Sequence, residues 1–212
     1  IDRLVDGEAR EGFQEFVRQM VGPAMERVGW EPRAGESELD KELRGVLVRG
    51  LGVLGRDAGV IARAVELEAE ARAGGDVEGP LAAASTAVAA HVGDEELRLA
   101  YAAMYRDGAT PQLKRRYLAA LGLFPEEEHV ERSLSLALDG YVRSQDRYNL
   151  VGPCLANREH GGSAWGFVKE NWEQLCGKMT AHLRTYMIEP GGGFSTRELY
   201  SDFNKQFSAY YE

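Results

Sequence analysis

The side chains best suited to chemistry are few, and their spacing matches no catalytic motif. The four histidines are His91, His129, His160 and His182. A zinc hydrolase needs two histidines at i and i+4 on one helix face with a glutamate between them, and none of the four stands in such an HExxH sequence. A GxSxG elbow, a Walker-type phosphate loop and a GxGxxG turn after a strand are absent as well. The chain itself therefore predicts no catalytic residue, no cofactor and no metal ligand.

Cys154 and His160 are the one pair that could supply a thiol nucleophile and its base. Such a site also needs a third group that orients the histidine, and no such group is identifiable in the sequence. Unpaired cysteine is among the most frequently buried residue types. We therefore expect Cys154 to be a buried packing residue.

The composition is acidic, because 34 Asp and Glu against 25 Lys and Arg give the 212 residues a formal net charge of −9. Nucleic-acid binding needs clustered basic side chains, and the longest basic run is only Lys114-Arg115-Arg116, so we expect no nucleic-acid partner. No window approaches the roughly 18 uncharged apolar residues of a membrane helix. Two cysteines imply no disulfide framework, which favours a reducing, cytoplasmic location.

Apolar side chains recur with helical spacing through most of the chain. Between Leu97 and Tyr105 they stand at relative positions 0, 3, 4, 7 and 8, which places them on one helix face. No segment shows the alternation of a strand. The expected helices are 8–28, 39–54, 58–73, 80–92, 95–107, 111–122, 126–138, 145–157, 164–187 and 196–210. Residues that favour helix N-termini open several of these helices, namely Asp57, Asp94, Thr110, Ser144 and Ser163.

The order of the helices predicts an all-α fold. Helix pairs begin near Asp57, Asp94, Glu126 and Ser163, at intervals of 37, 32 and 37 residues, and short connections make neighbours pack as antiparallel hairpins. One amphipathic hairpin cannot bury its apolar face alone, whereas stacked hairpins share a continuous core. We therefore expect a right-handed superhelical stack of antiparallel helix pairs, a HEAT/armadillo-like α-solenoid. Residues 1–212 are expected to form a single helical domain.

Several ordered motifs resemble a known family. They are VRSQD at 142–146, Asn157-Arg158, AWGFVKENWEQL at 164–175 and FSTRELYSDF at 194–203, preceded by FVRQMVGPAMERVGWEPRAGESELDKELRGVL at 16–47. Together they resemble the C-terminal helical domain of the gluzincin zinc aminopeptidases, the family of aminopeptidase N, puromycin-sensitive aminopeptidase and the endoplasmic-reticulum aminopeptidases. The most specific piece is the AW-x-F-x-K-x-N-W pattern, and the resemblance runs from about Phe13 to Phe207.

The resemblance implies a division of labour. In that family the HExxH and GxMEN motifs, and the zinc, belong to a separate upstream catalytic domain, which the helical domain caps to enclose a peptide-sized chamber. Because the first residue is not Met and neither motif is present, we expect a fragment of a larger C-terminal domain that lacks its first helices and the catalytic domain. Such a fragment should be inactive alone. Its implied partners are the catalytic domain of the same polypeptide and peptide substrates.

Five polar side chains are candidates for contact with a peptide carboxylate or backbone. They are Arg143, Gln145, Arg147, Asn157 and Arg158. A structural role is the alternative, in which Arg143 and Asp146 tie adjacent hairpins together and Asn157 caps a helix end. Trp165 and Trp172, seven residues apart, are expected to be core packing residues.

A second function fits an α-solenoid equally well, because a fold alone does not specify an activity. The chain would then be a stand-alone interaction module for a protein partner.

Overall fold

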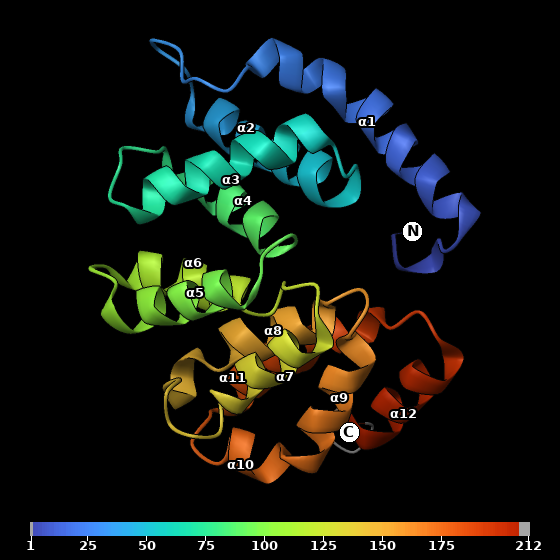
Figure 1. Ribbon diagram of the computed structural model, residues 1–212. Helices are drawn as coiled ribbons and strands as arrows, with labels where there is room; N and C mark the ends of the chain where they lie inside the picture. Colours follow the sequence, from blue (N-terminus) through green and yellow to red (C-terminus); the bar gives the residue numbers. More distant parts are fainter. Residues whose placement is uncertain (1, 208–212) are drawn as a thin grey trace. The chain divides into compact units, whose positions relative to one another are not determined.

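The structure, a computed structural model, describes residues 2–207, and within that range it is all-helical, with no strand. The chain divides into two compact units, residues 1–92 and 93–212. Within each unit the helices pack in pairs, as the helices of an α-solenoid do (Figure 1). The predicted all-α fold of stacked helix pairs is therefore confirmed.

The described residues of the first unit, 2–92, form four α-helices. They are α1 (Glu8–Val28), α2 (Glu38–Arg49), α3 (Ala58–Arg72) and α4 (Gly79–Ala90), with a 3-10 turn at Asp2–Leu4 and one π-helical turn at Gly50–Leu54. Helix α4 packs against both α2 and α3, and α1 packs against α2. The core is built from aliphatic side chains of all four helices, among them Met25, Val48, Ala64 and Val88.

Helices α2 and α4 approach closely because a glycine lies at their contact. A Cβ atom on Gly45 would lie 2.8 Å from the carbonyl oxygen of Pro80. The opposite side of α2 carries three exposed apolar side chains, Leu39, Leu43 and Val46, at i, i+4 and i+7. Helix α2 therefore has one buried face and one apolar face that nothing in the described chain covers.

The described residues of the second unit, 93–207, form eight α-helices. They are α5 (Glu95–Asp107), α6 (Pro111–Ala120), α7 (Glu127–Ser135), α8 (Tyr148–Ala156), α9 (Gly161–Glu170), α10 (Trp172–Cys176), α11 (Ala181–Ile188) and α12 (Arg197–Phe207), with 3-10 turns at Ser144–Asp146 and Glu189–Gly193. Helix α8 packs against α6, α7, α9 and α11 and is the central helix of this unit. A Cβ on Gly122 would lie 2.6 Å from the backbone nitrogen of Cys154, so only glycine allows the end of α6 to reach α8.

Aromatic side chains fill much of the core of the second unit. Tyr101 packs edge-on against Tyr117 and Phe124, with ring centroids 4.9 and 5.7 Å apart. Trp165 packs against Phe203 of α12 at 5.1 Å. Trp165 and Trp172 are only 1% and 7% exposed, which confirms that both are packing residues.

One long helix was expected over 164–187, and this prediction is wrong. Asn171 leaves the helical conformation (φ −111°, ψ 17°) and ends α9, while its side-chain amide donates to the carbonyl of Phe167. After Gly177, Thr180 begins α11 by accepting a hydrogen bond from the backbone of Leu183. The apolar spacing keeps its helical phase across both breaks, so periodicity alone could not reveal them.

Two predicted N-caps are wrong as well. Ser144 does not open a helix over 145–157, because a 3-10 turn occupies 144–146 and α8 begins only at Tyr148. Ser163 lies inside α9, where its hydroxyl donates to the carboxylate of Glu127. The predicted caps Asp57, Asp94 and Thr110 are confirmed, because each accepts a hydrogen bond from a backbone N–H three residues on.

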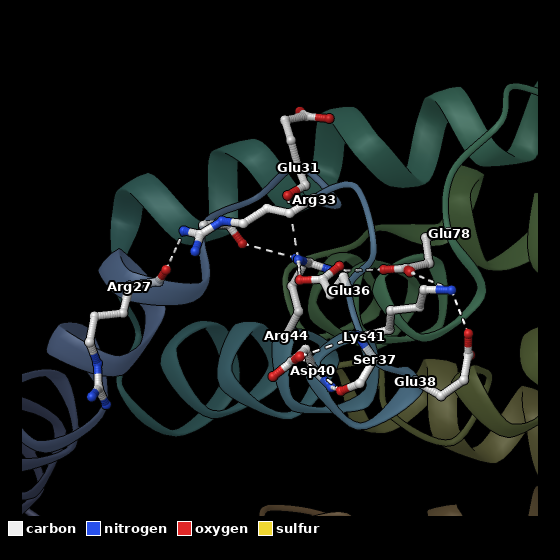
Figure 2. Close-up of polar contacts among 11 residues, drawn as sticks. Arg27, Glu31, Arg33, Glu36, Ser37, Glu38, Asp40, Lys41, Arg44 and Glu78 are labelled. Atoms are coloured by element: carbon white, nitrogen blue, oxygen red, sulfur yellow. Dashed lines mark hydrogen bonds and ion pairs between the residues drawn. The ribbon is translucent and has the colours of Figure 1, made fainter.

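A buried arginine holds the connections of the first unit together. Arg44 of α2 is fully buried, and its guanidinium bonds the carboxylates of Glu36 and Glu78 and the carbonyl oxygens of Gly29 and Glu31 (Figure 2). The hydrogen bond from Arg44 holds the pKa of Glu36 below its usual range. The α1–α2 and α3–α4 connections are therefore fixed around one charge.

Candidate functional site

The segment 139–147 of the second unit carries three of the five predicted peptide contacts. It begins with a tight turn in which the Asp139 carboxylate accepts from the backbone N–H of Tyr141 at 2.8 Å and Gly140 adopts φ +88°. The hydroxyl of Tyr141 donates to the carbonyl of Ala102 at 2.9 Å. The segment is thereby pinned to α5 just before Arg143.

Arg143 is exposed but held in place. Its Nε and Nη2 atoms donate to Oδ2 of Asp146 at 2.8 and 2.7 Å, and its side chain is 64% exposed. The hydroxyl of the buried Tyr105 donates to the same carboxylate oxygen and accepts from the backbone N–H of Arg143, each at 3.3 Å. The hydrogen bond to Asp146 raises the pKa of Arg143, whereas burial raises the pKa of Tyr105. The result is a fixed cation that faces solvent.

Arg147 has a different environment, although it lies only four residues further on. It is 9% exposed, and its Nη1 atom donates to the carbonyl oxygens of Gln174 and Leu175 at 2.9 and 2.7 Å. These are carbonyls of the last turn of α10, where a cation is favourable. Arg147 therefore ties the start of α8 to the end of α10.

Two clefts are lined in part by Arg143. The larger, of about 460 Å³, is lined by Tyr105, Tyr141, Lys114 and the α5–α6 connection. The smaller, of about 380 Å³, lies between segment 140–147 and the end of α10. Gln145 is exposed on the same segment. Of the five predicted peptide contacts, Arg143 is the one that lines both clefts.

Asn157 and Arg158 lie at the other end of α8. The Asn157 amide donates to the carbonyls of Gly122 and Phe124 at 3.2 and 3.1 Å, and its side-chain oxygen accepts from the backbone N–H groups of Glu159 and His160, both at 3.1 Å. Arg158 forms an ion pair with the neighbouring Glu159. Asn157 is fully engaged in fixing the chain between α8 and α9, and the structure does not bring it or Arg158 to the clefts at Arg143.

Cys154 is buried, as expected, and so is Cys176; both are free thiols. Burial raises the pKa of Cys154 far above its ordinary value and raises that of Cys176 to about 11. His160 contacts the carbonyl of Pro125 at 2.8 Å through Nε2. Neither thiol has the exposure or acidity of a nucleophile.

Residues 2–207 contain neither a cluster of metal-binding side chains nor a helix that could span a membrane. No group of three or more His, Cys, Asp or Glu side chains there is arranged to hold a metal ion. None of the helices described in this range is long and apolar enough to cross a membrane.

Sequence reasoning missed the second wall of the smaller cleft. That wall consists of Glu173, Gln174, Gly177 and Lys178, which lie about 30 residues downstream of Arg147. The prediction of one continuous helix over 164–187 could not reveal this wall. It placed Gly177 and Lys178 inside a helix, whereas both lie in the connection between α10 and α11. A break signal at Gly177 with a cap at Thr180 was the available clue.

The comparison with protein families matches residues 1–211 to the ERAP1-like C-terminal domain. The chain belongs to this family. Among similar proteins, aminopeptidase M1-A of Oryza sativa subsp. japonica is 29% identical over 202 residues, covering 89% of this chain and 22% of that protein. Aminopeptidase 2, mitochondrial, of Saccharomyces cerevisiae is 25% identical, covering 95% of this chain and 22% of that protein.

A bacterial relative agrees with these two. Aminopeptidase N of Lactococcus lactis subsp. cremoris is 27% identical over 209 residues, covering 95% of this chain and 24% of that protein. The chain spans less than a quarter of the length of these relatives. The resemblance predicted from the sequence motifs is therefore confirmed for an ERAP1-like C-terminal domain.

Proposed function

We propose that this chain is the C-terminal helical domain of a zinc-dependent aminopeptidase that removes N-terminal residues from peptides. The family match over residues 1–211 carries the proposal, and the names of the relatives, all aminopeptidases, support it. The zinc and the catalytic residues would belong to an upstream domain. This helical domain would wall the substrate chamber.

The alternative role of a stand-alone interaction module is not favoured, because the similar proteins are aminopeptidases. In the proposed role the partners are a catalytic domain of the same polypeptide and peptide substrates. A single domain over residues 1–212 is supported by one family match across both compact units. A cytoplasmic location is supported by the two free, buried cysteines.

Arg143 and Gln145 are the proposed peptide contacts of greatest interest, because both are exposed and Arg143 lines two clefts. Asn157, which is committed to backbone groups, would position the chain between α8 and α9. Arg147 and Arg158 complete the proposed set, Arg147 from the edge of the smaller cleft.

The test compares this chain with the open reading frame that contains it. Both are assayed for release of a fluorophore from aminoacyl amides, with and without a zinc chelator. We expect chelator-sensitive activity from the longer protein and none from the 212 residues alone. Inactivity of the longer protein over a broad set of aminoacyl amides and peptides would remove the aminopeptidase proposal.

The contact residues are tested in the same active protein. Arg143→Ala should raise KM for a peptide of several residues and leave kcat/KM for a short aminoacyl amide unchanged, because the short substrate does not reach this domain. Arg197→Ala, on the exposed start of α12, is the matched control. An equal effect on both substrates would contradict peptide contact by Arg143.

A further inference from the structure

Arg147 is a buried cation that no carboxylate balances. No acidic oxygen of the described residues lies within the 4.0 Å of an ion pair with it, and the neighbouring Asp146 is engaged by Arg143 and Tyr105. Burial of a charge is unfavourable unless it is paired and hydrogen-bonded. The carbonyl dipoles of Gln174 and Leu175 offset part of this penalty.

The guanidinium also has unused donors. An arginine has five N–H groups in a fixed fork, and here Nη1 donates to the carbonyl oxygens of Gln174 and Leu175. Within residues 2–207, Nε is buried without a hydrogen-bond partner, and Nη2 has none either. Because Arg147 lines the smaller cleft, an acceptor in that cleft would meet an incompletely bonded guanidinium.

The other residues that line the smaller cleft also favour a negatively charged ligand. Arg143 and Lys178, both exposed, line it with Arg147, and Ser144 adds a hydroxyl group. Glu173 is the one carboxylate in this lining. Asp146, which pairs with Arg143, adds a second acid next to the cleft, so three cations face two acids, and the balance still favours an anion. A volume of about 380 Å³ suits a small group rather than a folded partner.

We propose that this cleft is an oxyanion-binding site, in which Arg147, Arg143 and Lys178 bind a carboxylate or phosphate group. A planar guanidinium matches both groups in geometry. Two sources are possible for this chemistry: a free phosphate-type ion, or the C-terminal carboxylate of a peptide. Only the peptide source rests on the proposed function.

The proposal is tested by calorimetric titration of the 212-residue chain with inorganic phosphate at constant ionic strength. We expect binding at one site per chain. A short peptide with a free C-terminal carboxylate is then added as competitor, beside the same peptide with a C-terminal amide. Competition by the acid alone identifies the peptide carboxylate as a ligand, and competition by neither identifies a free anion. Absence of binding by both phosphate and the acid peptide overturns the site.

Three substitutions distinguish this cleft from general attraction to positive charge. Lys178→Gln should weaken phosphate binding about two- to fivefold, as expected for one exposed charge, and Glu173→Gln should strengthen it. Arg197→Gln makes the same charge change on the exposed start of α12 and should have no effect. Equal losses for Lys178→Gln and Arg197→Gln would overturn the site.

A fourth variant tests the buried cation itself. Arg147→Met should abolish phosphate binding while the far-UV circular dichroism stays that of the parent chain. Because this variant also removes two backbone contacts, the exposed Lys178→Gln keeps the proposal testable if Arg147→Met fails to fold. Unchanged phosphate affinity in a folded Arg147→Met contradicts the proposal. Since phosphate binding needs no catalytic domain, its failure is separate from failure of the aminopeptidase assay.

Discussion

Arg44 and Arg147 are both buried arginines that bind backbone carbonyls, but only one of them has carboxylate partners. Arg44 meets Glu36 and Glu78 as well as two carbonyls, and its charge is fully compensated inside the first unit (Figure 2). Arg147 meets carbonyls alone and borders a cleft. Arg44 therefore stabilises the fold, whereas Arg147 keeps N–H groups without a hydrogen-bond partner among the described residues, with which it can bind a ligand.

The largest effect is expected from Arg44→Met. The substitution strands the carboxylates of Glu36 and Glu78 beside an apolar side chain, which costs about 3–5 kcal/mol of unfolding free energy. Urea unfolding followed by circular dichroism measures it. The triple variant Arg44→Met, Glu36→Gln, Glu78→Gln should recover part of the loss, because no buried charge is left. A loss below about 1 kcal/mol for Arg44→Met would erase the contrast with Arg147.

A smaller loss is expected from Arg147→Met. It removes two charged hydrogen bonds to backbone carbonyls, but it also removes a buried charge that lacks a carboxylate, so the net cost is about 1–2 kcal/mol. The same urea unfolding experiment reports it. Phosphate should stabilise the parent chain and leave this variant unaffected. Destabilisation as large as that of Arg44→Met would mean that both arginines serve the fold equally.

The charged cluster around Glu95 makes the free energy of unfolding depend on pH. The hydrogen bond from Arg98, followed by that from Arg132, lowers the pKa of Glu95 to about 2, and His129 faces the same carboxylate at 3.5 Å. The folded pKa lies below the ordinary value of 4.5. This stabilisation is therefore complete above pH 4.5 and is lost as the pH falls from 4.5 towards 2. Glu95→Gln should flatten the unfolding free energy over this interval.

The control for this pH effect is Glu173→Gln, which removes an exposed carboxylate that has no ion pair within residues 2–207. Its stability should follow the pH curve of the parent chain. If both variants flatten the curve equally, the acid sensitivity comes from overall charge and not from the Glu95 cluster.

The smallest effect is expected at the surface pair of Lys41 and Glu38, where Lys41 is 29% and Glu38 is 84% exposed. Lys41→Gln should shift the urea midpoint very little, because an ion pair with the exposed Glu38 contributes little and Glu78, which lies 4.0 Å from Lys41, stays bonded to Arg44. Lys41 lies three residues before Arg44 on the same helix, so the two variants form a matched pair. A midpoint shift comparable to that of Arg44→Met would show that position, and not burial, decides the effect.

The sequence alone predicted the fold and the family, but it did not predict the roles of the two buried arginines, Arg44 and Arg147. Helical spacing located most helices, and ordered motifs identified the domain. The roles of Arg44 and Arg147 depend on partners far along the chain, since Glu78 lies 34 residues from Arg44 and Leu175 lies 28 residues from Arg147. No local pattern distinguishes an arginine that finds carboxylates from one that finds only carbonyls. Peptide contact by the five predicted residues stays a prediction.

The shared anchoring of two connections by Arg44 has a consequence for local opening. Glu36 belongs to the α1–α2 connection and Glu78 to the α3–α4 connection, and both hold the same guanidinium. If either connection opened alone, it would leave a buried charge short of a partner. The two connections should therefore exchange their amide hydrogens together, as one cooperative unit, although about 40 residues of chain separate them.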